Sequence, residues 1–281
     1  MRYDYFKWNN DSRISPRVGF SYILDDKSIA RGTWGYFYQY PSITDFIPEY
    51  GGSRSLEALK AEHKILSYER ELPYETTVKI EGFLKDYSGL ISADFSQVIN
   101  AQNEIYNSVN GGVGWSRGIE LMVKNNYSEK ISGWLTYTLS RARKKEYNDT
   151  EYNDYEYDRR HIFNVGMKLQ PQRRLSIDML WRAYSGRLIN PYNMIDFKGS
   201  IRQIMYGEVN TLLTPPYNRF DVRFNKIFIY TGWQLSVYLE ILNLFNTKNV
   251  SGYHYNNATY AVEESYGIPF FPFIGIEAKF M

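Results

Sequence analysis

The stretch Trp233-Gln-Leu-Ser-Val-Tyr-Leu-Glu-Ile241 alternates apolar and polar side chains without a break. Its odd positions are all apolar, and its even positions are Gln234, Ser236, Tyr238 and Glu240. Successive side chains of a β-strand point to opposite faces of the sheet. The period of two therefore predicts a strand with one wholly apolar face and one face in contact with water.

Similar alternating runs recur along the whole chain. Eleven of them predict strands, over residues 16–24, 28–40, 59–69, 76–87, 115–125, 131–142, 161–170, 175–184, 219–230, 233–241 and 270–280. The connections alternate strictly between short turns and long loops, and the long ones span residues 41–56, 88–112, 143–160, 185–217 and 247–269. Membrane barrels have short periplasmic turns and longer extracellular loops. We therefore predict an all-β fold, an antiparallel transmembrane β-barrel sheet whose five long connections are extracellular.

The composition agrees with a membrane barrel but does not require one. The chain has 281 residues, of which 43% are hydrophobic and 17% aromatic, and 27 residues are Tyr. Amphipathic aromatic rings gather at the headgroup level of membrane barrels. No run approaches the ~18 apolar residues of a membrane helix. In a membrane, the backbone N–H and C=O groups of this chain would therefore have to be hydrogen-bonded in a closed barrel. On composition alone, a Tyr-rich secreted β-domain is an alternative.

Charge and cysteine content exclude several classes of function. The net charge of +2 gives no bulk attraction to nucleic acid. Cysteine is absent, which excludes disulfides, thiolate metal sites and cysteine nucleophiles. Residues 1–10 contain neither the apolar segment nor the small-residue cleavage site of a signal peptide. Because an exported barrel needs an export signal, we expect this chain to be a piece of something longer.

No catalytic or metal site stands out in the sequence. The three histidines, His63, His161 and His254, lie far apart, and none has a metal-ligand partner three or four residues away. His161 follows Arg159 and Arg160 at a strand start, which favours a structural or interfacial role. Ser140 and His161 fall near facing strand ends, and chance explains that proximity better than a hydrolase site. We therefore predict no enzyme activity, no catalytic residues, no metal site and no cofactor.

The loop 146–158 has two interpretations. It carries six carboxylates among tyrosines, namely Glu146, Asp149, Glu151, Asp154, Glu156 and Asp158. Carboxylates are hard oxygen ligands for Ca²⁺, and Tyr rings stack on sugars, so the loop could contact a cation or a glycan. The favoured interpretation is a solvated extracellular loop, because its spacing does not match an EF-hand.

Five motifs follow one another along the chain. They are Ser15-Pro-Arg-Val-Gly-Phe20 with Trp34-Gly-Tyr-Phe-Tyr-Gln-Tyr-Pro41, Asn110-Gly-Gly-Val-Gly-Trp-Ser-Arg-Gly-Ile-Glu120, Tyr157-Asp-Arg-Arg-His161, Pro216-Tyr-Asn-Arg-Phe-Asp-Val-Arg223 and Leu242-Asn-Leu-Phe-Asn246. In this order, they resemble the C-terminal half of the barrel of TonB-dependent outer-membrane receptors. The resemblance covers nearly the whole chain.

The resemblance implies a domain organisation and a function. Such transporters have 22 strands around a plugged lumen, so residues 1–281 would be the C-terminal part of that barrel, without its plug domain and N-terminal barrel half. The complete protein would lie in the Gram-negative outer membrane, in contact with its lipid. It would bind a small nutrient, such as a siderophore, cobalamin or a glycan, and import it with TonB, which would contact the missing N-terminal region. The resemblance assigns no ligand-binding residues.

The alternative is a plugless porin-like or adhesin-like barrel. The two models differ at the sheet edges, which lie near Arg17 and Ile274. A piece of a larger barrel leaves both edges unpaired, whereas a self-contained barrel pairs residues 16–24 with residues 270–280.

Nine charged residues are expected on the face opposite the apolar one. They are Lys79, Glu81, Glu120, Lys124, Asp178, Arg182, Asp221, Arg223 and Glu240. In the family that the chain resembles, such residues line the channel and hold the plug. We expect most of them to form Asp–Arg pairs between neighbouring strands, each contributing at most ~1 kcal/mol.

Overall fold

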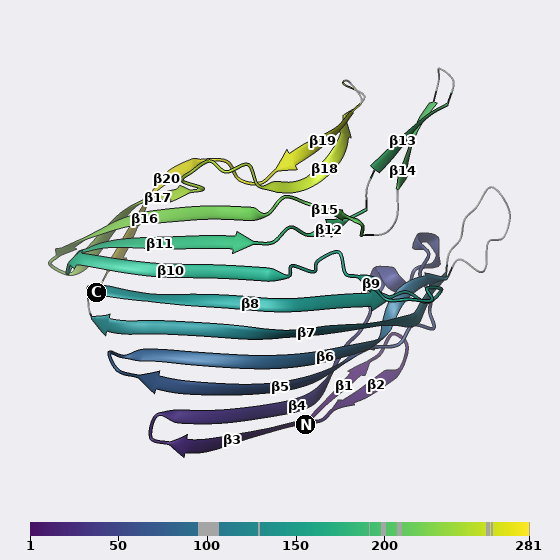
Figure 1. The fold of residues 1–281 in the computed structure, drawn as a ribbon, viewed down its shortest axis with the longest axis horizontal. Helices are drawn as coiled ribbons and strands as arrows, with labels where there is room; N and C mark the ends of the chain where they lie inside the picture. Colours follow the sequence, from purple (N-terminus) through teal and green to yellow (C-terminus); the bar gives the residue numbers. More distant parts are fainter. Residues whose placement is uncertain are drawn as a thin grey trace. The chain divides into compact units, whose positions relative to one another are not determined.

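A large antiparallel sheet dominates the computed structural model, which describes residues 1–94, 107–128, 130–190, 192–197, 201–206, 210–256, 259 and 261–280. Its strands follow the order β20-β17-β16-β11-β10-β8-β7-β6-β5-β4-β3 (Figure 1), and the short β9 pairs with β8. Their bounds are β3 Arg17–Asp25, β4 Ser28–Gln39, β5 Leu59–Leu72, β6 Thr76–Asp94, β7 Asn107–Ser128, β8 Ile131–Lys145, β9 Asn153–Asp154, β10 His161–Gln172, β11 Leu175–Tyr184, β16 Tyr217–Tyr230, β17 Trp233–Leu242 and β20 Phe271–Phe280. All eleven predicted strands are present, and the predicted antiparallel all-β fold is confirmed.

The second long connection is shorter than the sequence predicts. β6 continues to Asp94 rather than ending at residue 87, and β7 begins at Asn107 rather than at residue 115. The added segments are rich in Gly, Ser and Asn and do not alternate, yet a strand ladder is made by backbone groups whatever the side chains are. Asn110 also supports this end of the sheet, because its side-chain amide donates to the carbonyls of Gly89 at 2.8 Å and Glu57 at 3.0 Å.

The other long connections contain structure of their own. The first holds two 3₁₀ turns, η1 Ile43–Phe46 and η2 Pro48–Tyr50. The fourth holds β12 Leu188–Ile189 paired with β15 Leu212–Leu213, and β13 Tyr192–Phe197 paired with β14 Ile201–Tyr206. The fifth holds the hairpin of β18 Val250–Asn256 and β19 Ala261–Tyr266. Since these strands are short and irregularly patterned, the alternation rule does not detect them.

A hairpin at the start of the chain packs on the first long connection. β1 Arg2–Phe6 pairs with β2 Asp11–Ser15. The Phe6 ring stacks on Tyr40 and Phe46, with centroids 4.8 and 5.8 Å apart. Phe46 and Leu56 are 2% and 1% exposed, so a small hydrophobic core lies here, outside the sheet. This hairpin lies outside the eleven predicted strands.

By its contacts the chain divides into two compact units, which are described separately. Unit 1 contains residues 1–68, 81–119 and 140–158, and unit 2 contains residues 69–80, 120–139 and 159–281. Strands β5 to β8 contribute residues to both. Among the described residues, no helix has the length and apolar character needed to span a membrane.

The strand register of unit 2 builds a continuous apolar face. Residues directly opposite each other in neighbouring strands lie on the same face of the sheet. One such row crosses six strands, from β20 to β8, through Ile274, Leu239, Phe224, Ile177, Leu169 and Ile131. The odd positions of the run 233–241 therefore share one apolar face with five neighbouring strands, as the alternation indicates.

The two edge strands of the sheet are unpaired with each other. β3 and β20 end the strand order, and no ladder joins them among the described residues. All nine residues of β3 are exposed, as are Ile274 at 72% and Ile276 at 71% on β20. The sheet is not closed on itself, as expected for part of a larger barrel rather than for a self-contained eleven-stranded one.

Candidate functional site

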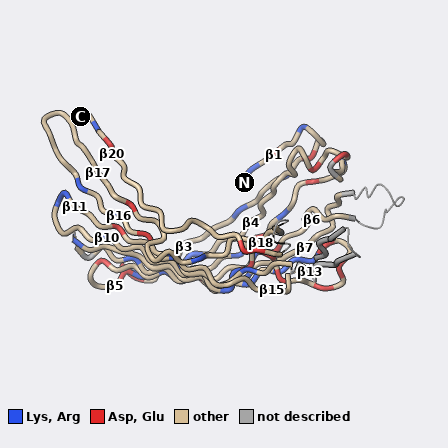
Figure 2. The backbone as a smooth tube through the Cα atoms, turned by 90° about the horizontal axis from the view of Figure 1, so that it is seen from above, with Lys and Arg blue, Asp and Glu red and all other residues tan. Residues whose placement is uncertain are grey.

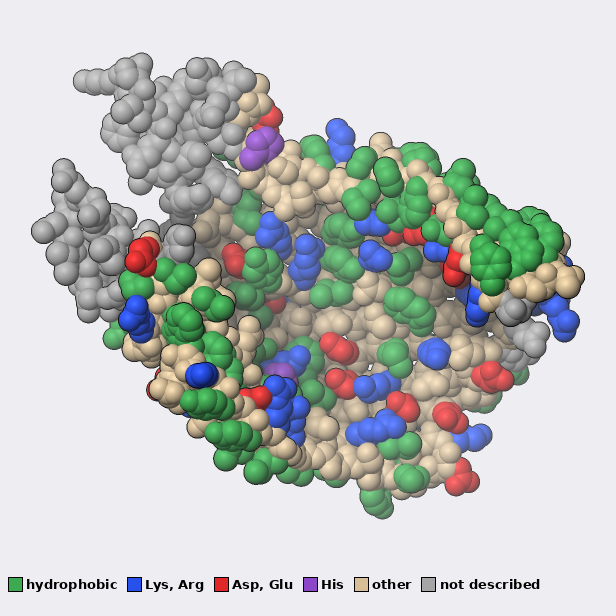
Figure 3. Space-filling view, turned by 180° about the vertical axis from the view of Figure 1, so that it is seen from behind, with side chains coloured by type: hydrophobic (Ala, Val, Ile, Leu, Met, Phe, Trp, Pro, Cys, Tyr) green, Lys and Arg blue, Asp and Glu red, His purple; other side chains and the backbone are tan. Residues whose placement is uncertain are grey.

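A row of charged residues crosses the opposite face of unit 2. The register places Glu240 of β17 opposite Arg223 of β16, Arg223 opposite Asp178 of β11, and Asp178 opposite Lys168 of β10. The signs therefore alternate across four strands. The charged positions of these strands are coloured in Figure 2, and Figure 3 shows acidic and basic side chains interspersed with hydrophobic ones on one face of the molecule.

Ion pairs and an aromatic ring hold this row in place. The Arg223 guanidinium lies 3.3 Å from the Glu240 carboxylate and 3.7 Å from the centre of the Tyr238 ring. The Tyr238 ring in turn covers Gly275 of β20, where a Cβ atom would overlap it. Arg223 thus pairs across neighbouring strands, although with a Glu rather than the predicted Asp.

A second ion pair forms within a strand instead. Arg219 Nε lies 2.7 Å from Asp221 Oδ1. Both side chains line a hollow of about 290 Å³, together with Asp178, Met179, Leu180, Arg182, Val222, Arg223, Glu240 and Leu242. Asp221 thus pairs within its own strand rather than across strands, because its direct neighbour on β11 is Leu180. The hollow brings Arg219, which was not among the nine predicted charged residues, together with five that were: Asp178, Arg182, Asp221, Arg223 and Glu240.

The Asn-Leu-Phe-Asn motif fixes the end of β17 through hydrogen bonds. Asn243 is fully buried and adopts the left-handed conformation, with φ 51°. Its backbone N–H donates to Asp221 at 2.8 Å, and its side-chain amide donates to the carbonyls of Thr247 at 3.0 Å and Ile268 at 2.9 Å. Asn tolerates this conformation better than most residues. The hydrogen bonds of Asn243 therefore connect β16, the end of β17 and the segment before β20.

Two further asparagines, Asn249 and Asn246, form hydrogen bonds at the start of β16 and just before β20. The Asn249 side chain accepts from the backbone N–H of Asn218 at 2.7 Å and donates to its carbonyl at 2.9 Å. Asn246 accepts from the backbone N–H of Phe270 at 3.0 Å. These side chains replace ladder hydrogen bonds where the strands stop.

The Tyr-Asp-x-x-His motif is also structural. In unit 1, Asp158 is buried and accepts from the backbone N–H of Ala142 at 2.8 Å. In unit 2, the backbone N–H of His161 donates to Ser185 Oγ at 3.1 Å, and its ring Nδ1 lies 2.8 Å from the Tyr137 hydroxyl.

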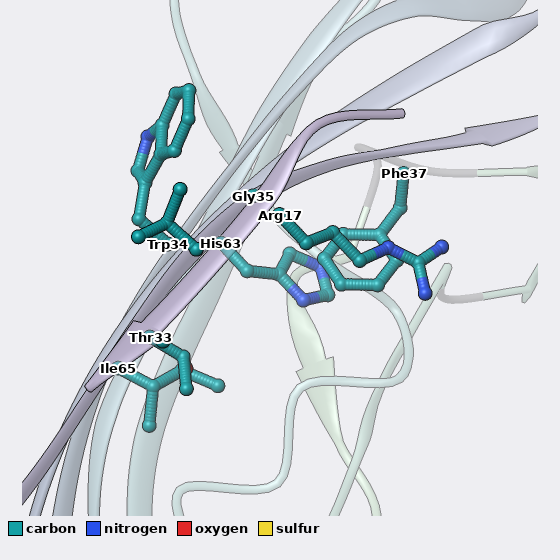
Figure 4. A pocket seen from close by; sticks show the side chains of 9 residues that line it. Arg17, Thr33, Trp34, Gly35, Phe37, His63 and Ile65 are labelled. Atoms are coloured by element: carbon teal, nitrogen blue, oxygen red, sulfur yellow. The ribbon is translucent and has the colours of Figure 1, made fainter. Parts of the chain in front are cut away.

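The other two histidines occupy separate surroundings. The centres of the His63 and Phe37 rings are 4.4 Å apart, and the Arg17 guanidinium lies 4.2 Å from the centre of the Phe37 ring (Figure 4). These three side chains line a hollow of about 310 Å³ in unit 1. His254 Nδ1 lies 2.9 Å from Ser265 Oγ on the β18–β19 hairpin. Within the described part of the chain, no three His, Cys, Asp or Glu side chains gather as metal ligands would.

Most carboxylates of the acidic loop 146–158 in unit 1 form ion pairs or hydrogen bonds with nearby residues. Four of the six have partners nearby: Glu146 with Lys144 and Ser92, Asp149 with Asn153, Asp154 with Arg141, and Asp158 with the backbone of Ala142. The Tyr155 and Tyr157 rings meet edge to face, 5.5 Å apart. Burial and the nearby Glu156 raise the pKa of Tyr155. A cation contact would have to displace these hydrogen bonds.

Arginines and stacked tyrosines meet where β11 and β16 join the longest connection. The Tyr184 and Tyr217 rings stack, with centroids 5.1 Å apart and 13° between their planes. The Arg159 guanidinium lies 5.4 Å from the Tyr184 ring centre and donates to the Ser185 carbonyl at 3.1 Å. Burial lowers the pKa of Arg159, and the nearby positive charge of Arg187 lowers it further. Sequence reasoning missed this cluster, because no local pattern shows that these strand ends are neighbours.

Comparisons with known proteins give the family and the fold. Residues 1–244 match the family model described as TonB dependent receptor-like, beta-barrel. The comparison with curated protein sequences finds no match. Among solved structures, a variant of the ferric enterobactin receptor PfeA from Pseudomonas aeruginosa matches with a TM-score of 0.68 and 15% identity, over 98% of this chain and 41% of that one.

Two further structures show the same arrangement. The outer membrane transporter YddB from Escherichia coli matches with a TM-score of 0.69 and 11% identity, over 99% of this chain and 42% of that one. The ferripyoverdine receptor of the outer membrane of Pseudomonas aeruginosa matches with a TM-score of 0.63 and 14% identity, over 95% of this chain and 33% of that one. The chain thus spans less than half the length of these proteins.

Proposed function

Because this chain belongs to the TonB-dependent receptor β-barrel family, we propose that it forms the C-terminal part of an outer-membrane receptor that imports a scarce nutrient. The family and the similar solved structures are receptors and transporters rather than enzymes. Two similar structures are named as receptors for ferric enterobactin and ferripyoverdine. A ferric siderophore is therefore the ligand class that we assign to the complete receptor.

The two-faced sheet of unit 2 carries this proposal. One face is a continuous apolar surface across six strands, which suits contact with lipid. The other face carries the alternating charged row and the hollow of about 290 Å³. In the complete receptor this second face would line the lumen and contact the plug, with the remaining barrel strands supplied by other parts of the protein.

The open edges support the same domain organisation. Unpaired backbone groups cost several kcal/mol each in lipid, so β3 and β20 need strand partners in the membrane. Outer-membrane transporters enclose their plugged lumen with 22 strands. Eleven further strands and a plug domain would complete the barrel, and TonB would act on a segment outside residues 1–281.

Growth under iron restriction tests the proposal. We expect deletion of the gene in its native host to abolish growth on the cognate ferric siderophore, and re-expression to restore growth only in cells with functional TonB. Uptake that continues without TonB would contradict the proposal and favour the plugless porin-like barrel.

A further inference from the structure

The loop ends of β10, β11 and β16 gather more positive charge than their surroundings balance. We call the residues concerned the arginine–tyrosine cluster: Arg159, Arg182, Arg187, Arg219, Tyr184 and Tyr217. All belong to unit 2. Resting on the proposed receptor function, we propose that this cluster is an anion-binding site that selects a negatively charged, oxygen-rich ligand over a neutral one.

The register forces like charges together. Arg182 of β11 lies directly opposite Arg219 of β16, an arrangement that destabilises a sheet when nothing balances the charge. Among the described residues, Asp221 is the only carboxylate within ion-pair distance of the four arginines, and its partner is Arg219. Within the cluster, four arginines therefore have one carboxylate at ion-pair distance, and Asp178 and Glu240 are the other carboxylates of the hollow that Arg182 and Arg219 line. A bound anion would remove this repulsion.

The geometry of the cluster is held by contacts that leave guanidinium groups available. Arg159 and Arg187 use one nitrogen each to donate to backbone carbonyls, of Ser185 at 3.1 Å and of Ser251 at 2.8 Å. A guanidinium has five N–H donors, so several on each side chain are free to bind an oxyanion. The bidentate fork of Arg suits carboxylate, phosphate and catecholate oxygens.

The tyrosine pair adds a fixed surface beside these donors. The Tyr184 hydroxyl donates to Asn164 Oδ1 at 2.9 Å, which orients its ring against Tyr217. The Arg159 guanidinium lies 5.4 Å from the Tyr184 ring centre, and the opposed pair Arg182–Arg219 lies on the same face of β11 and β16, two residues along each strand from the stacked rings. Planar anionic groups such as catecholates are therefore matched in both charge and shape.

The position of the cluster fits a ligand that arrives through the long connections. Arg182 and Arg219 also line the hollow of about 290 Å³ on the charged face. The cluster thus adjoins the hollow on the charged face of β11 and β16, which Asp221 and Arg223 also line.

Binding of two matched ferric complexes to the purified full-length receptor tests the inference. The probes are a hexadentate tris(catecholate) ferric complex with three negative charges and a neutral tris(hydroxamate) ferric complex of similar size. We expect the anionic complex to bind more tightly, and to weaken as NaCl increases because salt screens exposed charges. Arg182→Gln and Arg187→Gln should each weaken its binding about tenfold, the loss expected for a charge-assisted hydrogen bond, and leave the neutral complex unaffected.

Arg174→Gln is the matched control, because Arg174 lies in the short turn at the other end of β11 and is exposed. It should bind both complexes as the parent does. The anion site is refuted if both variants of the cluster bind the anionic complex as tightly as the parent does. It is also refuted if the parent binds the neutral complex as tightly as the anionic one. If the neutral complex binds tightly and the Arg182 and Arg187 variants do not change its affinity, the anion site alone is refuted and the proposed receptor function remains. A folded receptor that binds neither complex would refute both proposals.

Discussion

Leu239 offers the sharpest test of which face of the sheet contacts lipid. It occupies the row of six apolar residues across unit 2, between Phe224 and Ile274, and it is 37% exposed. Val237, two residues away, directly faces Lys226, so an Arg at position 237 would add like-charge repulsion to the cost of placing a cation in lipid. Leu239 has apolar neighbours on both sides, so Leu239→Arg tests contact with lipid alone, and it should cost ~2–4 kcal/mol for a position near the bilayer midplane.

The matched control is Ser236→Arg on the charged face. Ser236 lies opposite Ile227 and Glu277 and donates a 2.6 Å hydrogen bond to Asn225 Oδ1. The new cation would lose this hydrogen bond but gain the Glu277 carboxylate as a partner. We expect a change within ~1 kcal/mol.

Urea unfolding of the full-length receptor in lipid vesicles measures both variants. At 1.4 kcal/mol per tenfold change, Leu239→Arg should reduce the folding equilibrium constant by a factor of about 30 to 1,000. Equal losses for the two substitutions, or a larger loss for Ser236→Arg, would refute the assignment of the apolar face to lipid.

Four further outcomes follow from the structure. Asn243→Ala should destabilise the receptor by about 2–4 kcal/mol, because it removes several buried hydrogen bonds, and urea unfolding would measure the loss. Phe46→Ala should open the small core of unit 1, at a local cost of about 3–5 kcal/mol, and proteolysis of residues 41–58 should accelerate; an unchanged cleavage rate would contradict this. Hydrogen bonds from Thr259 and Asn256 lower the pKa of Glu263, so their contribution to the β18–β19 hairpin should persist below the ordinary Glu pKa and disappear only as pH falls through the lowered value; amide exchange of the hairpin against pH measures this, and Glu263→Gln should abolish the pH dependence. A cysteine introduced at position 153 should react with an impermeant maleimide on intact cells and one at position 172 should not, whereas the reverse pattern would invert the proposed topology.

Local pattern was sufficient to find the strands of the sheet. A period of two needs only neighbouring residues, so runs such as 233–241 identify both a strand and its apolar face. The motifs were recognisable for the same reason, although their role was not. Nothing in Leu242-Asn-Leu-Phe-Asn246 shows that Asn243 would be buried against Asp221, because that contact depends on how β16 and β17 pair.

The sequence by itself determined that this chain forms amphipathic antiparallel strands separated alternately by turns and long connections. Tertiary structure decided which residues lie opposite one another, since register is a relation between distant segments and a slip of one residue exchanges the two faces. It alone placed Arg182 opposite Arg219, aligned Glu240, Arg223, Asp178 and Lys168 into one charged row, and folded the β1–β2 hairpin onto Phe46. Side chains far apart in sequence acquire these roles only when backbone hydrogen bonds bring their strands together.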